Sequence, residues 1–237
     1  MKNIATNLLI ILTHNKRFKC SLIGCVTILS AILGGAYQTA SAQTWYLKPS
    51  VGLSIYSSVE GTSENIGTAD GKITADLDTG FSAGLGIGYQ INKHWSIELD
   101  WEYRSNDSST TLPDGDTFDE GNYASNVFFI NGYYDFAPVG SWTSFTGAGL
   151  AFIQEIDVDL ERDGAERSYS ASADLGFQVV GGVKLKLDKR LDLYGAARYQ
   201  SFPSIDTFEL EEGTGTGTID GFDYSPASLT IGAYYRF

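Results

Sequence analysis

The chain has 237 residues, 43% of them hydrophobic and 13% aromatic, which is enough to bury one substantial core. It carries 29 acidic against 16 basic residues, a formal net charge of −13, and this acidity excludes nucleic acid as a natural partner. The 27 glycines and only 5 prolines favour a β protein, whose strands need small residues at tight places.

The first 42 residues differ in composition from the rest of the chain. They hold no acidic residue, and a basic stretch that ends at Lys19 precedes the apolar run CSLIGCVTILSAILGGA. Ala40 and Ala42 then supply the small side chains that signal peptidase requires. We therefore predict a signal peptide over 1–42, Sec-dependent export and a mature domain over 43–237.

Two alternatives for this segment remain open. LIGC, which ends at Cys25, is similar to a lipoprotein processing box, but most of the apolar run follows the cysteine instead of preceding it. An uncleaved membrane anchor is the other, although the apolar run is shorter than the roughly 20 residues of a spanning helix.

After residue 42, apolar and polar residues alternate with a period of two, which predicts strands. The alternation is clear in 44–59, 73–91 and 95–104, and in 73–91 we expect every odd position from Ile73 to Ile91 to lie on one face. Five further segments have matching spacing, and the first two alternate less regularly: 122–136, 142–157, 170–187, 191–206 and 225–237. In 170–187 we expect Ala171 to share one face with Leu175, Phe177 and Val179.

The connections between these segments alternate in length. Short turns are expected at 92–94, 137–141 and 188–190, and long polar loops at 60–72, 105–121, 158–169 and 207–224. Even strand number, short periplasmic turns and long outer loops are the layout of an outer-membrane barrel. We predict an all-β fold, an eight-stranded antiparallel up-and-down transmembrane β-barrel.

The free energy of placing charged side chains in hydrocarbon decides which face of the strands meets lipid. Placing Glu98, Asp100 and Glu102 against hydrocarbon is prohibitive, so the apolar face must point outward and charges of both signs must fill the lumen. The charges expected to face inward are Lys48, Glu98, Asp100, Glu102, Arg104, Asp174, Lys184, Lys186, Arg198 and Arg236. An aromatic girdle is predicted from residues at the strand ends near the short turns: Trp45, Tyr89, Trp95 and Trp142. A soluble barrel with its apolar face inward is the alternative, and it explains no girdle.

The hairpin GLGIGYQINKHWSIELDWEYR at 84–104 and the terminal alternation from Leu229 to Phe237 resemble the OmpA-like and OmpX-like eight-stranded outer membrane protein β-barrel domain family. The resemblance implies a Gram-negative outer-membrane location. It also implies an assembly signal read by the barrel assembly machinery, formed by Ile231, Ala233, Tyr235 and Phe237.

The chemistry available to the mature chain is sparse. Its single histidine, His94, lies in a predicted periplasmic turn, far from the outer rim where lipid A-modifying barrels of similar architecture place a catalytic histidine, so we expect no enzyme, no catalytic residue and no cofactor. A complete metal-binding loop is not expected. Four acids begin a calcium-loop pattern that lacks its twelfth ligand, and they are interpreted either as a solvated acidic loop or as a weak cation site: Asp157, Asp159, Glu161 and Asp163.

The expected function is a structural one, in envelope integrity and surface interaction. Its partners would be outer membrane lipids, lipopolysaccharide and an extracellular or host partner that contacts the acidic loops. A narrow porin-like diffusion channel is the alternative, and a lipid A-modifying barrel is the less favoured one.

Overall fold

The computed structural model describes residues 44–56, 58–163, 165–171, 175–205, 208–210 and 216–237. The predicted signal peptide over 1–42 thus lies outside the described residues. The described chain consists of strands: β1 (Thr44–Ile55), β2 (Val59–Glu64), β3 (Gly71–Leu77), β4 (Gly80–Gln90), β5 (Trp95–Thr111), β6 (Thr117–Asp135), β7 (Trp142–Arg162), β8 (Ala165–Ala171), β9 (Leu175–Lys186), β10 (Leu191–Ile205), β11 (Glu209–Leu210), β12 (Thr218–Asp220), β13 (Phe222–Tyr224) and β14 (Ala227–Arg236).

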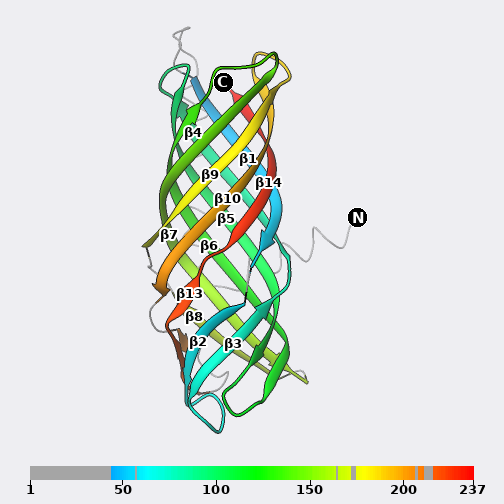
Figure 1. The fold of residues 1–237 in the computed structure, drawn as a ribbon, viewed down its shortest axis with the longest axis vertical. Helices are drawn as coiled ribbons and strands as arrows, with labels where there is room; N and C mark the ends of the chain where they lie inside the picture. Colours follow the sequence, from blue (N-terminus) through cyan, green and yellow to red (C-terminus); the bar gives the residue numbers. More distant parts are fainter. Residues whose placement is uncertain (1–43, 57, 164, 172–174, 206–207, 211–215) are drawn as a thin grey trace. The chain divides into compact units, whose positions relative to one another are not determined.

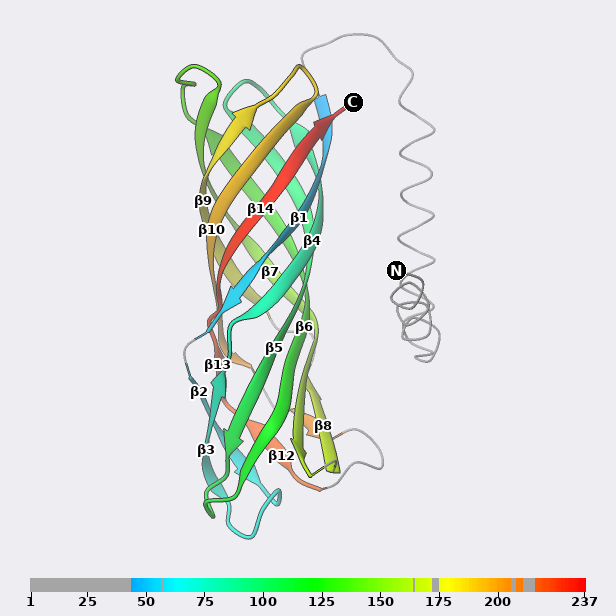
Figure 2. The ribbon, with the colours of Figure 1, turned by 90° about the vertical axis from the view of Figure 1, so that its right-hand side faces the viewer.

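Eight of these strands close a ring within the described chain, in the order β1, β4, β5, β6, β7, β9, β10 and β14 (Figures 1 and 2). Antiparallel pairing of β14 with β1 completes it, for example between Ile231 and Val51. Closure leaves no unpaired sheet edge in this part of the wall. The prediction of an eight-stranded antiparallel barrel is therefore confirmed.

The barrel has two distinct ends. The turn end carries the connections at 91–94, 136–141 and 187–190, and the Phe237 N–H donates to the Trp45 carbonyl there, at 3.1 Å. The loop end, drawn at the bottom of Figures 1 and 2, carries β2, β3, β8, β12 and β13, and β11 pairs with β8 there. We call the part of the wall next to the turn end the lower barrel and the part next to the loop end the upper barrel. Among the described residues, no helix is long and apolar enough to span a membrane.

The predicted long loops at the loop end are mostly strand, which corrects their expected lengths. β5, β6 and β7 extend to 17, 19 and 21 residues. Beyond the eight-stranded ring, on the side of the loop end, these long strands pair with the short strands to form a second ring. In it β3 joins β5, β2 joins β3, β12 joins β2, β8 joins β7 and β11 joins β8. A bridge between Phe208 and Ile219 closes the described part of this upper wall.

A bulge separates the two levels of the wall and reverses which side chains face inward. Leu77 pairs with Ser108 and Phe81 with Ser105, so four steps along one strand oppose three along the other. Because a one-residue slip exchanges the faces of a strand, Ile73 and Ala75 are fully buried, which corrects their predicted place on the outward face.

A second bulge reverses β7. Asn126 pairs with Glu155 but Val127 pairs with Ile153, so Gln154 is the extra residue. Below it the large apolar residues Leu150 and Phe152 point outward and are exposed, and above it alternate residues from Ile156 to Leu160 are buried. The lower barrel is thus apolar outside, whereas the upper barrel is apolar inside.

The predicted strand over 170–187 is also divided. Its described parts are the end of β8 and all of β9, and 172–174 lie outside the described residues. Ala171 is buried, whereas Leu175, Phe177 and Val179 are exposed, so Ala171 does not share their outward face as expected.

Candidate functional site

The lumen at the turn end is filled by ion pairs and aromatic rings. Lys184 Nζ lies 2.7 Å from Asp135 Oδ1, and Arg236 pairs with Asp192. Above these pairs lies an apolar layer made of Tyr46, Tyr133, Phe145, Val180, Tyr194, Ala196 and Tyr234. Inward glycines leave room for the rings, since a Cβ on Gly88 would lie 2.1 Å from the ring of Tyr46.

A buried cluster around Lys48 occupies the next level of the lumen. Lys48 pairs with Glu98, and its Nζ lies 3.0 Å from Asp100 Oδ2 and 4.9 Å from the centroid of the Tyr133 ring. Asn131 donates to Asp100 at 3.2 Å. One cation is therefore held by two carboxylates and an aromatic face, away from solvent.

Two arginines continue this network toward the loop end. Arg198 Nη1 donates to Glu102 Oε2 at 3.1 Å, and its Nη2 lies 3.6 Å from Asp100. Arg104 Nε donates to the same Glu102 at 2.7 Å. Lys48, Arg104 and Arg198 thus balance Glu98, Asp100 and Glu102, so a continuous neutral set of charges crosses the lumen.

The sequence predicted most of these lumen charges but not all of them. Lys186, expected to face inward, is exposed because it lies at the rim of the turn end, and Asp174 lies outside the described residues. Asp135 and Asp192, which pair with Lys184 and Arg236, were not singled out. Asp192 had a usable signal, because it alternates with Leu191 and Leu193 on β10.

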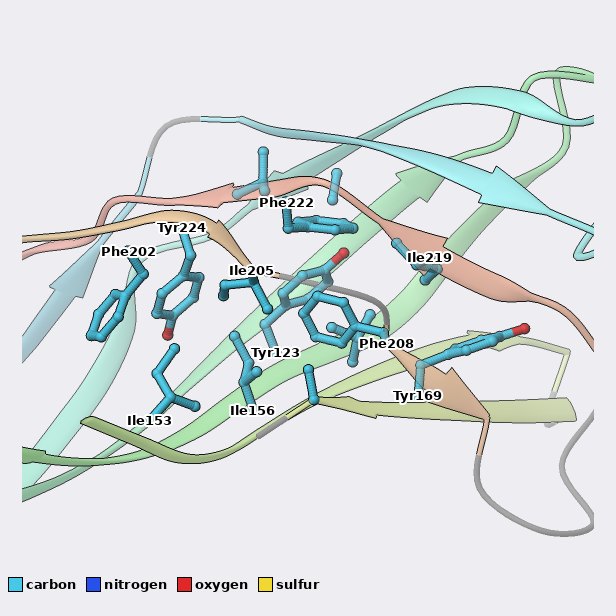
Figure 3. Close-up of a cluster of buried hydrophobic side chains, with 14 of the residues drawn as sticks. Tyr123, Ile153, Ile156, Tyr169, Phe202, Ile205, Phe208, Ile219, Phe222 and Tyr224 are labelled. Carbon is cyan, nitrogen blue, oxygen red and sulfur yellow. The ribbon is translucent and has the colours of Figure 1, made fainter. Parts of the chain in front are cut away.

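An apolar core fills the upper barrel, and the alternation of the sequence did not predict it. Figure 3 shows side chains from β6, β7, β8, β10, β12 and β13 pointing toward one another. Phe208 and Phe222 pack with ring centroids 5.3 Å apart, and Phe202 packs against Tyr224 at 5.7 Å. This core makes the loop end an ordered extension of the barrel wall.

The outer face of the upper barrel over β5, β6, β7 and β8 is acidic. Asp107, Asn122 and Asp159 are paired in one row across three strands, and Ser168 of β8 continues that row. Glu161 stands directly opposite Glu166. We call this surface the acidic face: Asp107, Glu155, Asp157, Asp159, Glu161 and Glu166.

Arg162 of β7 and Arg167 of β8 contact residues of other segments at the loop end. Arg167 donates to the Ile66 carbonyl at 2.6 Å, and Arg162 Nη1 lies 3.4 Å from Asp116 Oδ2. Both guanidinium groups also lie over the ring of Phe118, at 5.1 and 5.4 Å from its centroid. The guanidinium groups of β7 and β8 thus contact a backbone carbonyl, a carboxylate and an aromatic ring that lie outside the acidic face.

The predicted weak cation residues do not gather around a common point. Asp157, Asp159 and Glu161 alternate along β7, and Asp163 follows at the turn with a φ of 54°. In the portion of the chain that the structure describes, no three His, Cys, Asp or Glu side chains are grouped so as to hold a metal ion. Cation binding by these four acids stays a prediction.

The predicted girdle residues lie near the turn end. Trp45, Trp95 and Trp142 are about half exposed, at 48%, 51% and 52%, and Trp45 packs against Tyr89 at 5.1 Å. Trp95 adds Tyr134 to this set, with ring centroids 5.0 Å apart. Their role as a girdle stays a prediction.

His94 and the last residues of β14 also lie at the turn end, whereas Ile231 lies farther along the wall, opposite Val51. On β14 and just after it, Ile231, Tyr235 and Phe237 are exposed on the outer wall and Ala233 is half-buried among them. His94 Nδ1 lies 2.9 Å from the Asp135 carbonyl oxygen, and its ring stacks on Tyr134. Ala40 and Ala42, the predicted cleavage residues, lie outside the described residues.

Comparison with solved structures gives the same architecture. The structure is similar to the outer membrane protein OprG of Pseudomonas aeruginosa, with a TM-score of 0.62, 13% identity and coverage of 83% of this chain and 96% of that one. A major outer membrane protein of Thermus thermophilus has a TM-score of 0.54 and 13% identity, and the match covers 83% of this chain and 100% of that one. At such identities the likeness shows the fold alone.

A sequence relative is RC1281 of Rickettsia conorii, named as a candidate adhesin, which is 27% identical over 162 residues. The match covers 60% of this chain, and the chain spans 65% of the length of that relative. The model of the outer membrane protein beta-barrel domain family matches residues 26–237. With most of its length matched by that model, this chain belongs to the outer membrane protein beta-barrel domain family and resides in the bacterial outer membrane.

Proposed function

We propose that this chain is a non-enzymatic surface protein that supports the envelope and binds basic groups of an extracellular partner through its acidic face. The observation that carries the proposal is the ordered upper barrel. Short turns of such barrels face the periplasm, so the loop end faces outward. At about 3.4 Å per residue and a tilt of about 40°, the 21 residues of β7 rise about 55 Å, roughly twice the ~25 Å apolar band of an outer membrane.

The acidic face has a regular spacing that suits an extended cationic partner. Asp157, Asp159 and Glu161 project from alternate positions of β7, about 7 Å apart. Glu161 and Glu166 oppose each other, an arrangement that costs stability in a sheet. A partner with basic side chains at alternate positions would match the spacing of the acids on β7 and would reduce the repulsion between Glu161 and Glu166. The relative named as an adhesin supports a role in attachment.

The lumen supports a role other than transport or catalysis. The apolar layer, the ion pairs around Lys48 and Glu102, and the apolar core of the upper barrel occupy successive levels between the turn end and the loop end. His94, the only histidine among the described residues, contacts a backbone carbonyl at the turn end, away from the outer leaflet. Neither a continuous pore nor a histidine-based catalytic site is supported by this arrangement.

Binding to a lysine-rich peptide tests the proposal. The double variant Asp159→Asn with Glu161→Gln should bind an immobilised lysine-rich peptide more weakly than the wild type by about fivefold or more. The matched control is Glu60→Gln with Glu64→Gln, because β2 lies across the upper ring from β7. Equal binding by the wild type and both variants, or equal loss in both variants, would contradict the assignment to the acidic face.

A further inference from the structure

The turn between β9 and β10 presents three exposed cations at the turn end. Lys186, Lys189 and Arg190 are all exposed, within five consecutive residues. The one acid among them, Asp188, accepts hydrogen bonds from the backbone N–H groups of Arg190 and Leu191, at 2.6 and 2.8 Å. These bonds lower the pKa of the Asp188 carboxyl, and they direct it into the turn.

The ion pairs nearby use other cations. Lys184 pairs with Asp135 and Arg236 pairs with Asp192, both on the lumen side of the wall. The carboxylates of Asp135 and Asp192 are therefore already matched. Lys186, Lys189 and Arg190 remain as a compact positive rim, which we call the basic turn.

Apolar side chains adjoin the basic turn on its membrane side. Trp142 pairs with Leu185 across β7 and β9, and Trp142 also pairs with Val139. Leu187 is 51% exposed and Val139 is 80% exposed, so both project from the wall. Tryptophan prefers the depth of the lipid headgroups, and this position sets the basic turn at the level of the lipid phosphates.

We infer that the basic turn binds the phosphate groups of anionic phospholipids in the periplasmic leaflet. The three cations lie beside the exposed apolar side chains of Trp142, Leu187 and Val139, and cations at the edge of an apolar surface attract anionic lipid headgroups. The loop end is acidic and would repel anionic headgroups, so we expect anionic phospholipids to bind only in the periplasmic leaflet. This inference is independent of the role proposed for the acidic face.

Tryptophan quenching by brominated lipids measures this binding in the folded barrel. A form with Trp45, Trp95 and Trp101 changed to Phe leaves Trp142, beside the basic turn, as its reporter. Reconstituted into phosphatidylcholine vesicles, this form should be quenched more by brominated phosphatidylglycerol than by brominated phosphatidylcholine at equal mole fraction. The relative binding constant should favour phosphatidylglycerol by at least about fivefold, which is the contribution of a single Lys or Arg near the membrane surface.

The variants locate the effect. Lys186→Gln with Lys189→Gln and Arg190→Gln should bring the ratio to about one. As single changes, Lys189→Gln should reduce it, whereas Lys93→Gln, in the turn across the ring between β4 and β5, should leave it unchanged. Should the three tryptophan changes prevent folding, lipids retained by the wild type and the triple Gln variant in native mass spectrometry give the same comparison.

Three results would overturn the inference. They are equal quenching by both lipids in the wild-type turn, a phosphatidylglycerol preference that survives the triple Gln change, and a preference lost in Lys93→Gln instead of Lys189→Gln. Sedimentation with purified peptidoglycan that needs the three cations, combined with equal quenching by the two lipids, would assign the basic turn to the cell wall polymer instead.

Discussion

At the scale of single residues, the lumen shows how charge survives inside a membrane barrel. Glu102 accepts hydrogen bonds from Arg104 and Arg198, and Lys48 is shared by Glu98 and Asp100. Each of these side chains is almost completely buried. Burying an ion is expensive unless its partners are present, so the network depends on all of its members.

The first prediction removes one carboxylate from that network. Glu102→Gln should lower the free energy of unfolding by about 3–5 kcal/mol, because Arg104 and Arg198 would lose their shared partner. Glu60→Gln is the control, since Glu60 pairs with Lys72 at 2.7 Å but both side chains are more than half exposed, and its loss should cost about 0–1 kcal/mol. Urea unfolding in micelles followed by tryptophan fluorescence measures both, and identical midpoints for the two variants would contradict the prediction.

A second residue-scale prediction concerns Asp114, which links two loops at the loop end. The Thr68 N–H and hydroxyl donate to Asp114 Oδ2 at 2.7 and 2.8 Å, and the Asp116 N–H donates to Oδ1 at 3.1 Å. The backbone bond from Thr68, followed by that from Asp116, lowers the pKa of Asp114 below its ordinary value of 3.8.

Because this pKa is lowered on folding, the link contributes fully above pH 3.8 and is lost as the pH falls through the lowered value. The amide resonance of Thr68 should therefore titrate with a midpoint below 3.8, and Asp114→Asn should remove the titration. A midpoint at or above the ordinary value would show that the link does not form in solution.

At the scale of elements, bulges decide which face of a strand meets lipid. The alternation of 73–91 is continuous in sequence, yet β3 and β4 present opposite faces because one extra residue lies between them. Gly80 follows that bulge, where the backbone of β5 approaches closely. A Cβ at this position would lie 2.0 Å from the Ser105 carbonyl oxygen.

The third prediction tests this close approach. Gly80→Ala should destabilise the barrel by about 1–3 kcal/mol, because the wall must shift to admit the methyl group. Gly132→Ala is the matched control, since a Cβ there would meet no atom within 4 Å. Thermal unfolding monitored by gel mobility compares the two proteins. If Gly80→Ala unfolds at the same temperature as Gly132→Ala, the bulge tolerates a side chain.

At the scale of the whole molecule, the barrel is divided by depth and by charge. Its lower part exposes apolar side chains and encloses ion pairs, and its upper part encloses an apolar core and exposes acids. The turn end adds the cations of the basic turn. This polarity suits a protein that spans the outer membrane and presents a different surface on each side of it.

The fourth prediction concerns ion passage. The purified barrel in planar bilayers should show little steady conductance, because the side chains of an eight-stranded barrel fill its interior. A trimeric porin recorded under the same conditions serves as the positive control. Large, stable channels that persist at neutral pH would overturn the view of a filled lumen and would favour the diffusion-channel alternative.

The sequence by itself determined the barrel class, the number of membrane-crossing strands and the lipid-facing side chains of the lower wall. These follow from period-two alternation and from the prohibitive cost of charges in hydrocarbon, which are local properties. Even in 122–136, where large residues lie on both faces, the structure only had to choose between two registers. It places Phe129 and Tyr133 inside and Ile130 outside.

Only the tertiary structure decided what lies above the membrane. The regions expected to be long polar loops became strands, because residues such as Phe208, Ile156 and Ile73, far apart in sequence, bury one another inside the upper ring. The alternation within one segment does not indicate which distant residues will pack against it. It also does not indicate where a one-residue bulge exchanges the two faces of a strand. The partners of Asp135 and Asp192 were hidden for the same reason, since ring closure alone brings Lys184 and Arg236 to them.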